Sequence, residues 1–80
     1  MTSAETIVEA RKVDSVWKEL NNGKNGLKTS GHGRGLQYYS WDYLHNEIEV
    51  FNRRGIHLGA IDPTTGEWVK EAVKGRFIPL

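Results

Sequence analysis

Cysteine is absent from the 80-residue sequence. Neither a disulfide framework nor a thiolate zinc site is therefore available, and a single small domain must be held together by its core alone. Long hydrophobic runs are also missing. No apolar stretch approaches the ~20 residues that a transmembrane helix needs, and residues 1–19 mix charges with helix formers, unlike a signal peptide. We expect one soluble domain without a membrane anchor.

Excess charge of either sign is missing too. The chain has 11 Lys and Arg against 10 Asp and Glu, which gives a net charge of +1. Proteins that bind nucleic acids usually carry a basic surplus, because phosphate contacts supply much of their affinity. Charge alone argues mildly against an RNA partner, and any basic surface must come from local clusters such as Arg53-Arg54 or Lys70, Lys74 and Arg76.

Aromatic residues, by contrast, are well represented. The chain contains 3 Trp, 3 Tyr and 2 Phe, and such side chains bury large apolar areas. We expect Trp17, Trp41 and Trp68 to lead the core.

The N-terminal region has the pattern of a helix. Thr2-Ser-Ala-Glu5 is a capping-box sequence, and Asn21-Asn-Gly23 is typical of a helix end. Between them one apolar stripe recurs at helical spacing: Ile7, Ala10, Val13, Trp17 and Leu20. The spacing predicts a helix of about five turns within residues 1–22.

Residues 23–35 are rich in glycine and predict a flexible connection rather than a regular element. Gly31-His-Gly-Arg-Gly35 could bring backbone N–H groups near a phosphate. It lacks the flanking strand and helix of a phosphate-binding loop, so a plain linker is the expected structure.

Residues 36–80 show short strands separated by turns. The clearest turn signal is Asp62-Pro-Thr-Thr-Gly66. Five strands are predicted, at residues 36–41, 47–53, 56–61, 67–73 and 76–78. We expect an α+β fold, in which the N-terminal helix packs on a twisted antiparallel sheet of five short strands.

Three residues suited to proton transfer lie within the segment Tyr39-Ser-Trp-Asp-Tyr-Leu-His-Asn-Glu-Ile-Glu49. General acid–base catalysis needs one group to take a proton and another to give one, and Asp42, His45 and Glu49 could converge at one end of a hairpin. Alternation along the strand turns Glu49 away from the apolar side, toward solvent or a cleft. From spacing alone, the commoner interpretation is that these residues form a turn and solubilise the sheet.

Other kinds of site find less support. The 3 histidines and the scattered carboxylates lack compact metal-ligand spacing, so we expect no metal and no cofactor. No serine lies in a nucleophile elbow, and His57 is typical of a hydrogen-bonded strand histidine. Metal-free acid–base chemistry remains. Transesterification of RNA fits it well, because the 2′-hydroxyl of the substrate is itself the nucleophile.

Two ordered segments carry a resemblance to a known family. The pattern Tyr39-x-Trp-Asp42-x-x-His45-x-Glu-x-Glu49 is followed by Gly55-x-His-Leu-Gly59-x-x-Asp-Pro-x-Thr-Gly66. Together they resemble the C-terminal cytotoxic ribonuclease domain of colicins and cloacin, over residues 39–80. Their order and spacing favour a catalytic role for the carboxylates over a role as surface residues.

The resemblance implies an activity and a set of roles. Members of this family cut 16S ribosomal RNA of the 30S subunit once, in the decoding site, without a metal. By motif position, Glu49 is implied to be the general base, His45 the general acid and Asp42 the residue that orients the histidine. Three further residues are implied in holding the substrate or stabilising phosphate charge: Tyr39, Lys70 and Arg76.

The resemblance also implies a biological setting. A bacteriocin or contact-dependent inhibition toxin of this kind is secreted or delivered at the cell surface, acts in the cytoplasm of the target bacterium and is inhibited by a cognate immunity protein. Two alternatives remain open. One is a ribosome-dependent messenger-RNA interferase of the RelE type, and the other is a non-catalytic interaction domain whose acidic strand binds a basic partner.

Overall fold

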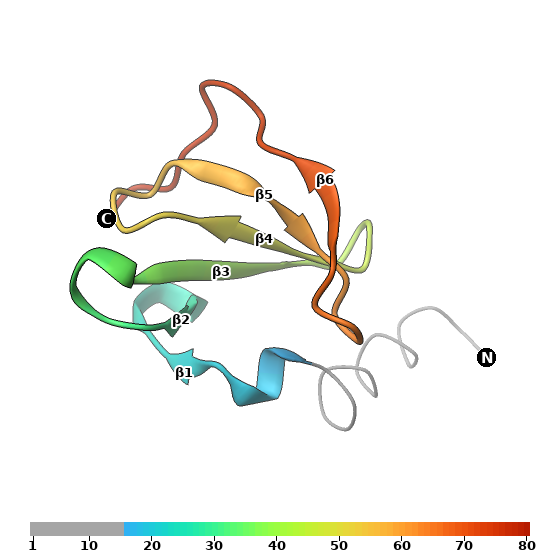
Figure 1. The fold of residues 1–80 in the computed structure, drawn as a ribbon, viewed down its shortest axis with the longest axis horizontal. Helices are drawn as coiled ribbons and strands as arrows, with labels where there is room; N and C mark the ends of the chain where they lie inside the picture. The colour runs from blue at the N-terminus through green and yellow to red at the C-terminus, as the bar shows by residue number, and fades with distance from the viewer. Residues whose placement is uncertain (1–15) are drawn as a thin grey trace.

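The computed structural model describes residues 16–80, which form one antiparallel β-sheet (Figure 1). Six strands follow one another across the sheet in chain order, so each strand pairs with its predecessor. Short 3-10 helices, η2 (Val16–Glu19), η3 (Lys24–Gly26) and η4 (Gly33–Gly35), precede the first three strands. The strands are β1 (Asn21–Asn22), β2 (Lys28–Ser30), β3 (Gln37–Asp42), β4 (Glu47–Phe51), β5 (His57–Ile61) and β6 (Trp68–Glu71).

The fold is mostly β, and the predicted α+β class is wrong. Among residues 16–80 no helix is longer than the four residues of η2. The Val16 N–H donates to the Pro63 carbonyl at 2.7 Å, Trp17 is buried, and the chain then enters β1. Sheet pairing and burial have overridden the helical spacing here. The predicted helix before Val16 lies outside the described residues, and no helix within them is long and apolar enough to span a membrane.

The glycine-rich segment contains a strand, so the prediction of a flexible connection without a regular element is wrong for residues 28–30. β2 pairs with β1 on one side and with β3 on the other. Tight turns flank it, in which Asn25, Gly26, Gly31 and Gly33 have positive φ angles. The glycines therefore serve the turns between paired strands, where a left-handed backbone is needed.

Four of the five predicted strands are confirmed to within two residues at each end, as β3, β4, β5 and β6. The fifth is reduced to an isolated bridge between Ile56 and Phe77. The Ile78 N–H also donates to the Gly55 carbonyl at 2.8 Å. These contacts hold the C-terminal segment beside the β4–β5 turn (Figure 1).

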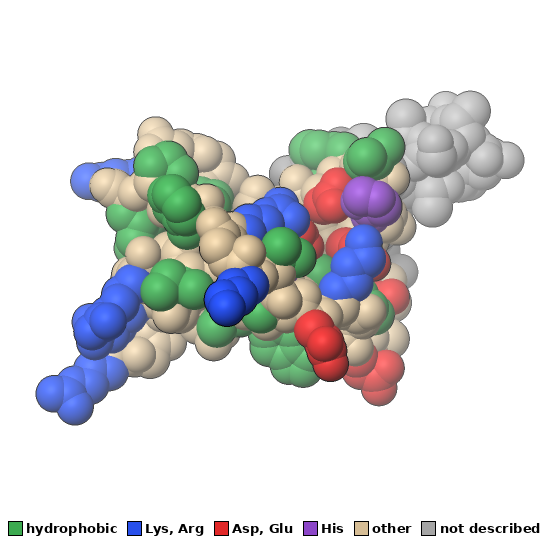
Figure 2. Space-filling view, turned by 90° about the horizontal axis from the view of Figure 1, so that it is seen from above, with side chains coloured by type: hydrophobic (Ala, Val, Ile, Leu, Met, Phe, Trp, Pro, Cys, Tyr) green, Lys and Arg blue, Asp and Glu red, His purple; other side chains and the backbone are tan. Residues whose placement is uncertain are grey.

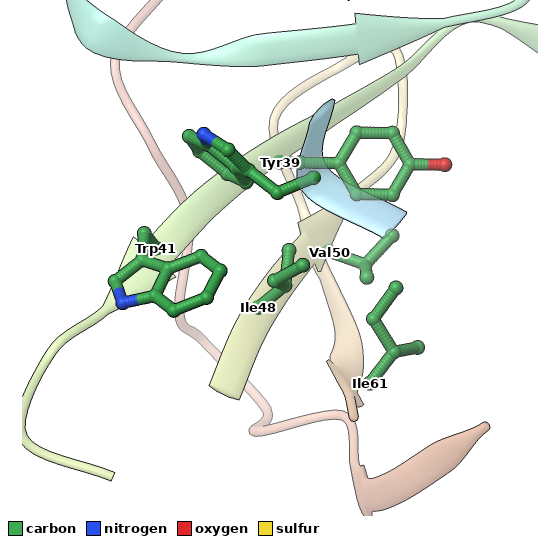
Figure 3. Close-up of a cluster of buried hydrophobic side chains, with 6 residues drawn as sticks. Tyr39, Trp41, Ile48, Val50 and Ile61 are labelled. Carbon is green, nitrogen blue, oxygen red and sulfur yellow. The ribbon is translucent and has the colours of Figure 1, made fainter. Parts of the chain in front are cut away.

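The core lies on one face of the sheet. Its buried cluster consists of Trp17, Tyr39, Trp41, Ile48, Val50 and Ile61, most of which Figure 3 labels. Tyr39 and Trp41 lie opposite Val50 and Ile48 in the register, so alternate residues of neighbouring strands face the same way. Trp17 covers this face from η2, with its ring edge-on to that of Trp41 at 5.6 Å between centroids.

The last strand, β6, forms one edge of the sheet. Trp68, which we expected in the core, lies on this strand and is 57% exposed. On the neighbouring strand β5, Gly59, which lies opposite Glu71 of β6, has a φ of 144°. A Cβ atom at position 59 would collide with the Lys70 carbonyl oxygen and press on the Trp68 ring. Glycine therefore sets how closely β6 approaches β5.

Candidate active site

The face of the sheet opposite the core carries the predicted chemistry. Asp42 lies opposite Glu47, Glu49 opposite Ala60, and Ala60 opposite Lys70. Because directly opposed residues project to the same side, the three carboxylates and the lysine share one face. A histidine lies beside acidic and basic side chains on the surface shown in Figure 2.

Asp42 and His45 form a local pair in the β3–β4 turn. One carboxylate oxygen of Asp42 accepts hydrogen bonds from the Leu44 and His45 amides at 3.0 and 3.2 Å. The other lies 2.8 Å from Nδ1 of His45. Asn46, with a φ of 54°, completes the turn. The carboxylate therefore fixes both the turn and the orientation of the imidazole.

The environment of Asp42 keeps this carboxyl ionised. Partial burial raises the pKa of Asp42, but the hydrogen bonds from the His45 ring, the His45 amide and the Leu44 amide outweigh it, so the pKa lies below its ordinary value. An ionised Asp42 requires a proton on Nδ1 of His45. Nε2 then remains for a substrate, and the side chain of His45 is 52% exposed.

Glu49 is more deeply buried than Asp42. It projects from the centre of the sheet and is only 5% exposed, so its charge must be met by nearby partners. Oε1 lies 2.6 Å from a guanidinium nitrogen of Arg76 and 3.4 Å from Nε2 of His57. Oε2 is buried and has no hydrogen-bond partner among the described residues. Within residues 16–80, only Oε1 of this carboxylate therefore has a polar partner, and Oε2 is buried without one.

His57 is the residue that sequence reasoning did not include in the site. The prediction of a hydrogen-bonded strand histidine is confirmed, since Nδ1 accepts a hydrogen bond from the Val73 amide at 2.9 Å. That bond places the proton of a neutral imidazole on Nε2, the nitrogen that faces Glu49. The ordered segment from Gly55 to Gly66 was a signal for it, although the apolar neighbours of His57 indicated a purely structural role.

Lys70 and Glu47 form a second ion pair, 2.9 Å between Nζ and Oε1. The hydrogen bond with Glu47 raises the pKa of Lys70 above its ordinary value, against an opposing effect of desolvation. The negative charges of Glu49 and Asp42 act on this pKa in the same direction as Glu47. Lys70 therefore connects the Asp42–His45 turn electrostatically with Glu49, while its side chain stays half exposed.

Tyr39 lies apart from the other predicted site residues. It is buried on the core face, where its hydroxyl lies 2.7 Å from Ser30 Oγ and donates to Gln37 Oε1 at 2.8 Å. These contacts tie β3 to β2, and a role in holding substrate stays a prediction. The tyrosine on the site face is its neighbour Tyr38, which lies opposite Phe51.

One group of residues has the composition of a metal site. Ligand atoms of Asp42, His45 and Glu47 all lie within 4.8 Å of one another. Two of these residues are bonded to each other, and the Glu47 carboxylate already contacts the Lys70 ammonium. The positive charge of Lys70 occupies the place that a cation would take, so this donor set does not fit a resident metal.

A family model described as "Cytotoxic" matches residues 4–79. Neither the curated proteins nor the solved structures yielded a match. The matched range takes in all the site residues described above and extends to the N-terminal region.

Proposed function

The chain belongs to the Cytotoxic family, the cytotoxic 16S ribosomal RNA ribonuclease domains of colicins and cloacin, and from this premise we propose that it cuts 16S ribosomal RNA in the decoding site. It is a toxin domain by family. The proposed reaction is metal-free endonucleolytic transesterification. It blocks translation because the cut falls in the decoding centre of the 30S subunit.

In the proposed reaction, Oε2 of Glu49 accepts the proton of a ribose 2′-hydroxyl, and the 2′-oxygen attacks the adjacent phosphorus. The bond from phosphorus to the 5′-oxygen breaks, and Nε2 of protonated His45 gives its proton to that oxygen. The products are a 2′,3′-cyclic phosphate and a 5′-hydroxyl end. Asp42 orients the imidazole, and Lys70 and Arg76 stabilise the charge on the phosphorane.

The observation that carries the proposal is the state of Glu49. A buried carboxylate with one oxygen on Arg76, and the other without a hydrogen-bond partner in the described part of the chain, suits a group that must accept a proton in a dry site. The exposed imidazole, already held by Asp42 on the same face, suits a proton donor to a leaving group. The charges of Glu49 and Asp42 both act on the ammonium group of Lys70.

The setting proposed for this activity follows the family. The domain would be secreted or delivered at a cell surface and would act in the cytoplasm of the target bacterium. Its partners would be the 30S subunit as substrate and a cognate immunity protein as inhibitor.

The test is incubation of the purified chain with bacterial ribosomes, followed by primer extension on 16S ribosomal RNA. We expect one strong stop in the decoding site. His45→Ala and Glu49→Gln should each lower the initial rate by about 10²- to 10⁴-fold, the usual contribution of one positioned acid or base. Glu67→Gln, which changes an exposed glutamate outside the site, should leave the rate unchanged.

Two other outcomes would contradict the proposal. Cleavage of translated messages with intact ribosomal RNA would select the messenger-RNA interferase. Intact RNA of both kinds, with folded protein by circular dichroism, would select a non-catalytic interaction domain.

A further inference from the structure

A pocket of about 330 Å³ opens beside the sheet, at some distance from the acid–base residues. Its lining consists of Gly23, Lys24, Asn25, Thr29, Tyr38 and Leu80. The volume falls within the roughly 300–1,000 Å³ that is typical of small-molecule sites. The proposed reaction uses none of these residues.

The pocket continues the face that carries the site. Thr29, Tyr38 and Phe51 lie opposite one another across β2, β3 and β4, and Ser40 lies opposite Glu49. Tyr38 and Ser40 are two residues apart on one strand, so they project to the same side. The separation along β3 is roughly 7 Å, a length that about one or two nucleotides of an extended RNA strand span.

The lining has the chemistry that recognises an unpaired nucleotide. The half-buried ring of Tyr38 offers a flat surface for stacking of a base. The exposed Lys24 supplies a cation for a phosphate, and the amide of Asn25 can both donate to and accept from a base edge. Within residues 16–80, no side chain that lines the pocket is acidic, in contrast to the acidic centre of the site face.

We infer that this pocket is a nucleotide subsite, which binds one unpaired nucleotide of the RNA strand beside the bond that is cut. Tyr38 stacks on the base, and Lys24 binds the adjoining phosphate. The strand then runs along β3 toward the two cations of the site, Lys70 and Arg76. The inference rests on the proposed function for the identity of the strand, although binding of a nucleotide can be measured without cleavage.

The direct test is titration of the isotope-labelled full chain with each of the four ribonucleoside 5′-monophosphates, followed by NMR of the backbone amides. We expect saturable shifts at the amides of residues 23–29 and Tyr38, and smaller shifts with inorganic phosphate alone. Tyr38→Ala should weaken binding between about 5-fold and 100-fold, the range for base stacking on one aromatic ring. Tyr38→Phe, which keeps the ring, should bind like the wild type.

A second measurement uses ribosome cleavage. Tyr38→Ala should raise KM more than it lowers kcat, because the subsite lies beside the reacting bond. Lys24→Gln should raise KM about 2-fold to 10-fold, as expected for one phosphate contact. Arg53→Gln removes the same charge from an exposed position that does not line the pocket, and it should have a smaller effect. Lys24 is itself exposed, so its variant tests the subsite even if Tyr38→Ala fails to fold.

The two measurements separate the inference from the proposed function. Cleavage that is indifferent to Tyr38→Ala and Lys24→Gln overturns the subsite and leaves the ribonuclease intact. If the wild type cuts no RNA, the ribonuclease proposal fails, and the titration alone decides the pocket. Absence of saturable shifts at residues 23–29, or equal binding by Tyr38→Ala, overturns the subsite in either case.

Discussion

Asp42 and His45 meet within a single turn, whereas Glu49, His57 and Arg76 come from three separate segments of the chain. The first pair is local and open to solvent. The second group is assembled by strand pairing and by the return of the C-terminal segment over β5. In the proposed reaction the proton donor must reach a substrate and can lie at a hairpin tip, whereas the base, whose charge is buried, needs partners from elsewhere in the fold.

The difference predicts that the two parts contribute unequally to stability. Removing Arg76 leaves a buried carboxylate with one poor partner, which is costly. Arg76→Met should therefore lower the free energy of unfolding by about 1–3 kcal/mol. Urea denaturation followed by tryptophan fluorescence measures it.

The matched control for that comparison is His45→Ala, which removes an exposed side chain from the turn. It should change the free energy of unfolding by less than about 0.5 kcal/mol, while it lowers the rate of cleavage by about 10²- to 10⁴-fold. Equal destabilisation by both variants would contradict the contrast between a local and an assembled half.

A second prediction concerns Glu47, which links the two halves through Lys70. Glu47→Gln keeps the size of the side chain but releases the lysine, so the rate of ribosome cleavage should fall about 10-fold, equivalent to about 1.4 kcal/mol. The rate of cleavage by the Lys70→Gln variant should fall at least as far. Because both changes act on one ion pair, the double variant should be no slower than Lys70→Gln alone. Multiplicative losses would show that Glu47 does not act by positioning Lys70.

The smallest expected effect is the pH dependence of the Asp42–His45 turn. The folded pKa of Asp42 is lowered, so its contribution to stability is complete above the ordinary value of 3.8 and is lost as pH falls through the folded value. Asp42→Asn should lower the free energy of unfolding by about 0.5–1 kcal/mol at neutral pH. The difference from the wild type should shrink below pH 4.

Denaturation curves measured between pH 3 and pH 7 check this prediction. His45→Ala serves as the control, because it removes the ring hydrogen bond and the charge of His45, both of which lower the pKa of Asp42. A difference between Asp42→Asn and the wild type that grows with acidity would contradict the assignment.

The proximity of Asp42 and His45 could be predicted from sequence, because residues three positions apart in one turn lie close together. The strands that carry the site could be predicted too, since alternation in β4 and the turn at Asp62–Gly66 depend on neighbouring residues. Burial of Glu49 could not be predicted. Alternation turned it away from the apolar face, but only the packing of residues 73–78 determines that this second face is also covered.

The prediction of a helix failed over residues 16–22 for a related reason, although Trp17 lies in the core as expected. A tryptophan at helical spacing cannot be told from one that packs on a sheet by its sequence neighbours. The hydrogen bond from Val16 to Pro63 joins residues far apart in the chain, so no local pattern predicts it. β2 escaped prediction because its short polar sequence has little strand preference and forms through pairing with β3. Trp68 was expected in the core because nothing in its own segment shows that β6 lies at the edge.

The site is also sensitive to substitution at Gly59, a residue that has no side chain and takes no part in the proposed reaction. Any substitution there displaces the strand that carries Lys70, since the backbone of Lys70 itself fills the space. Substitutions at many exposed positions of this domain should have little effect on its stability. A single methyl group at position 59, by contrast, should disrupt the site. Tolerance to mutation is therefore set by the closeness of two backbones as much as by the catalytic groups.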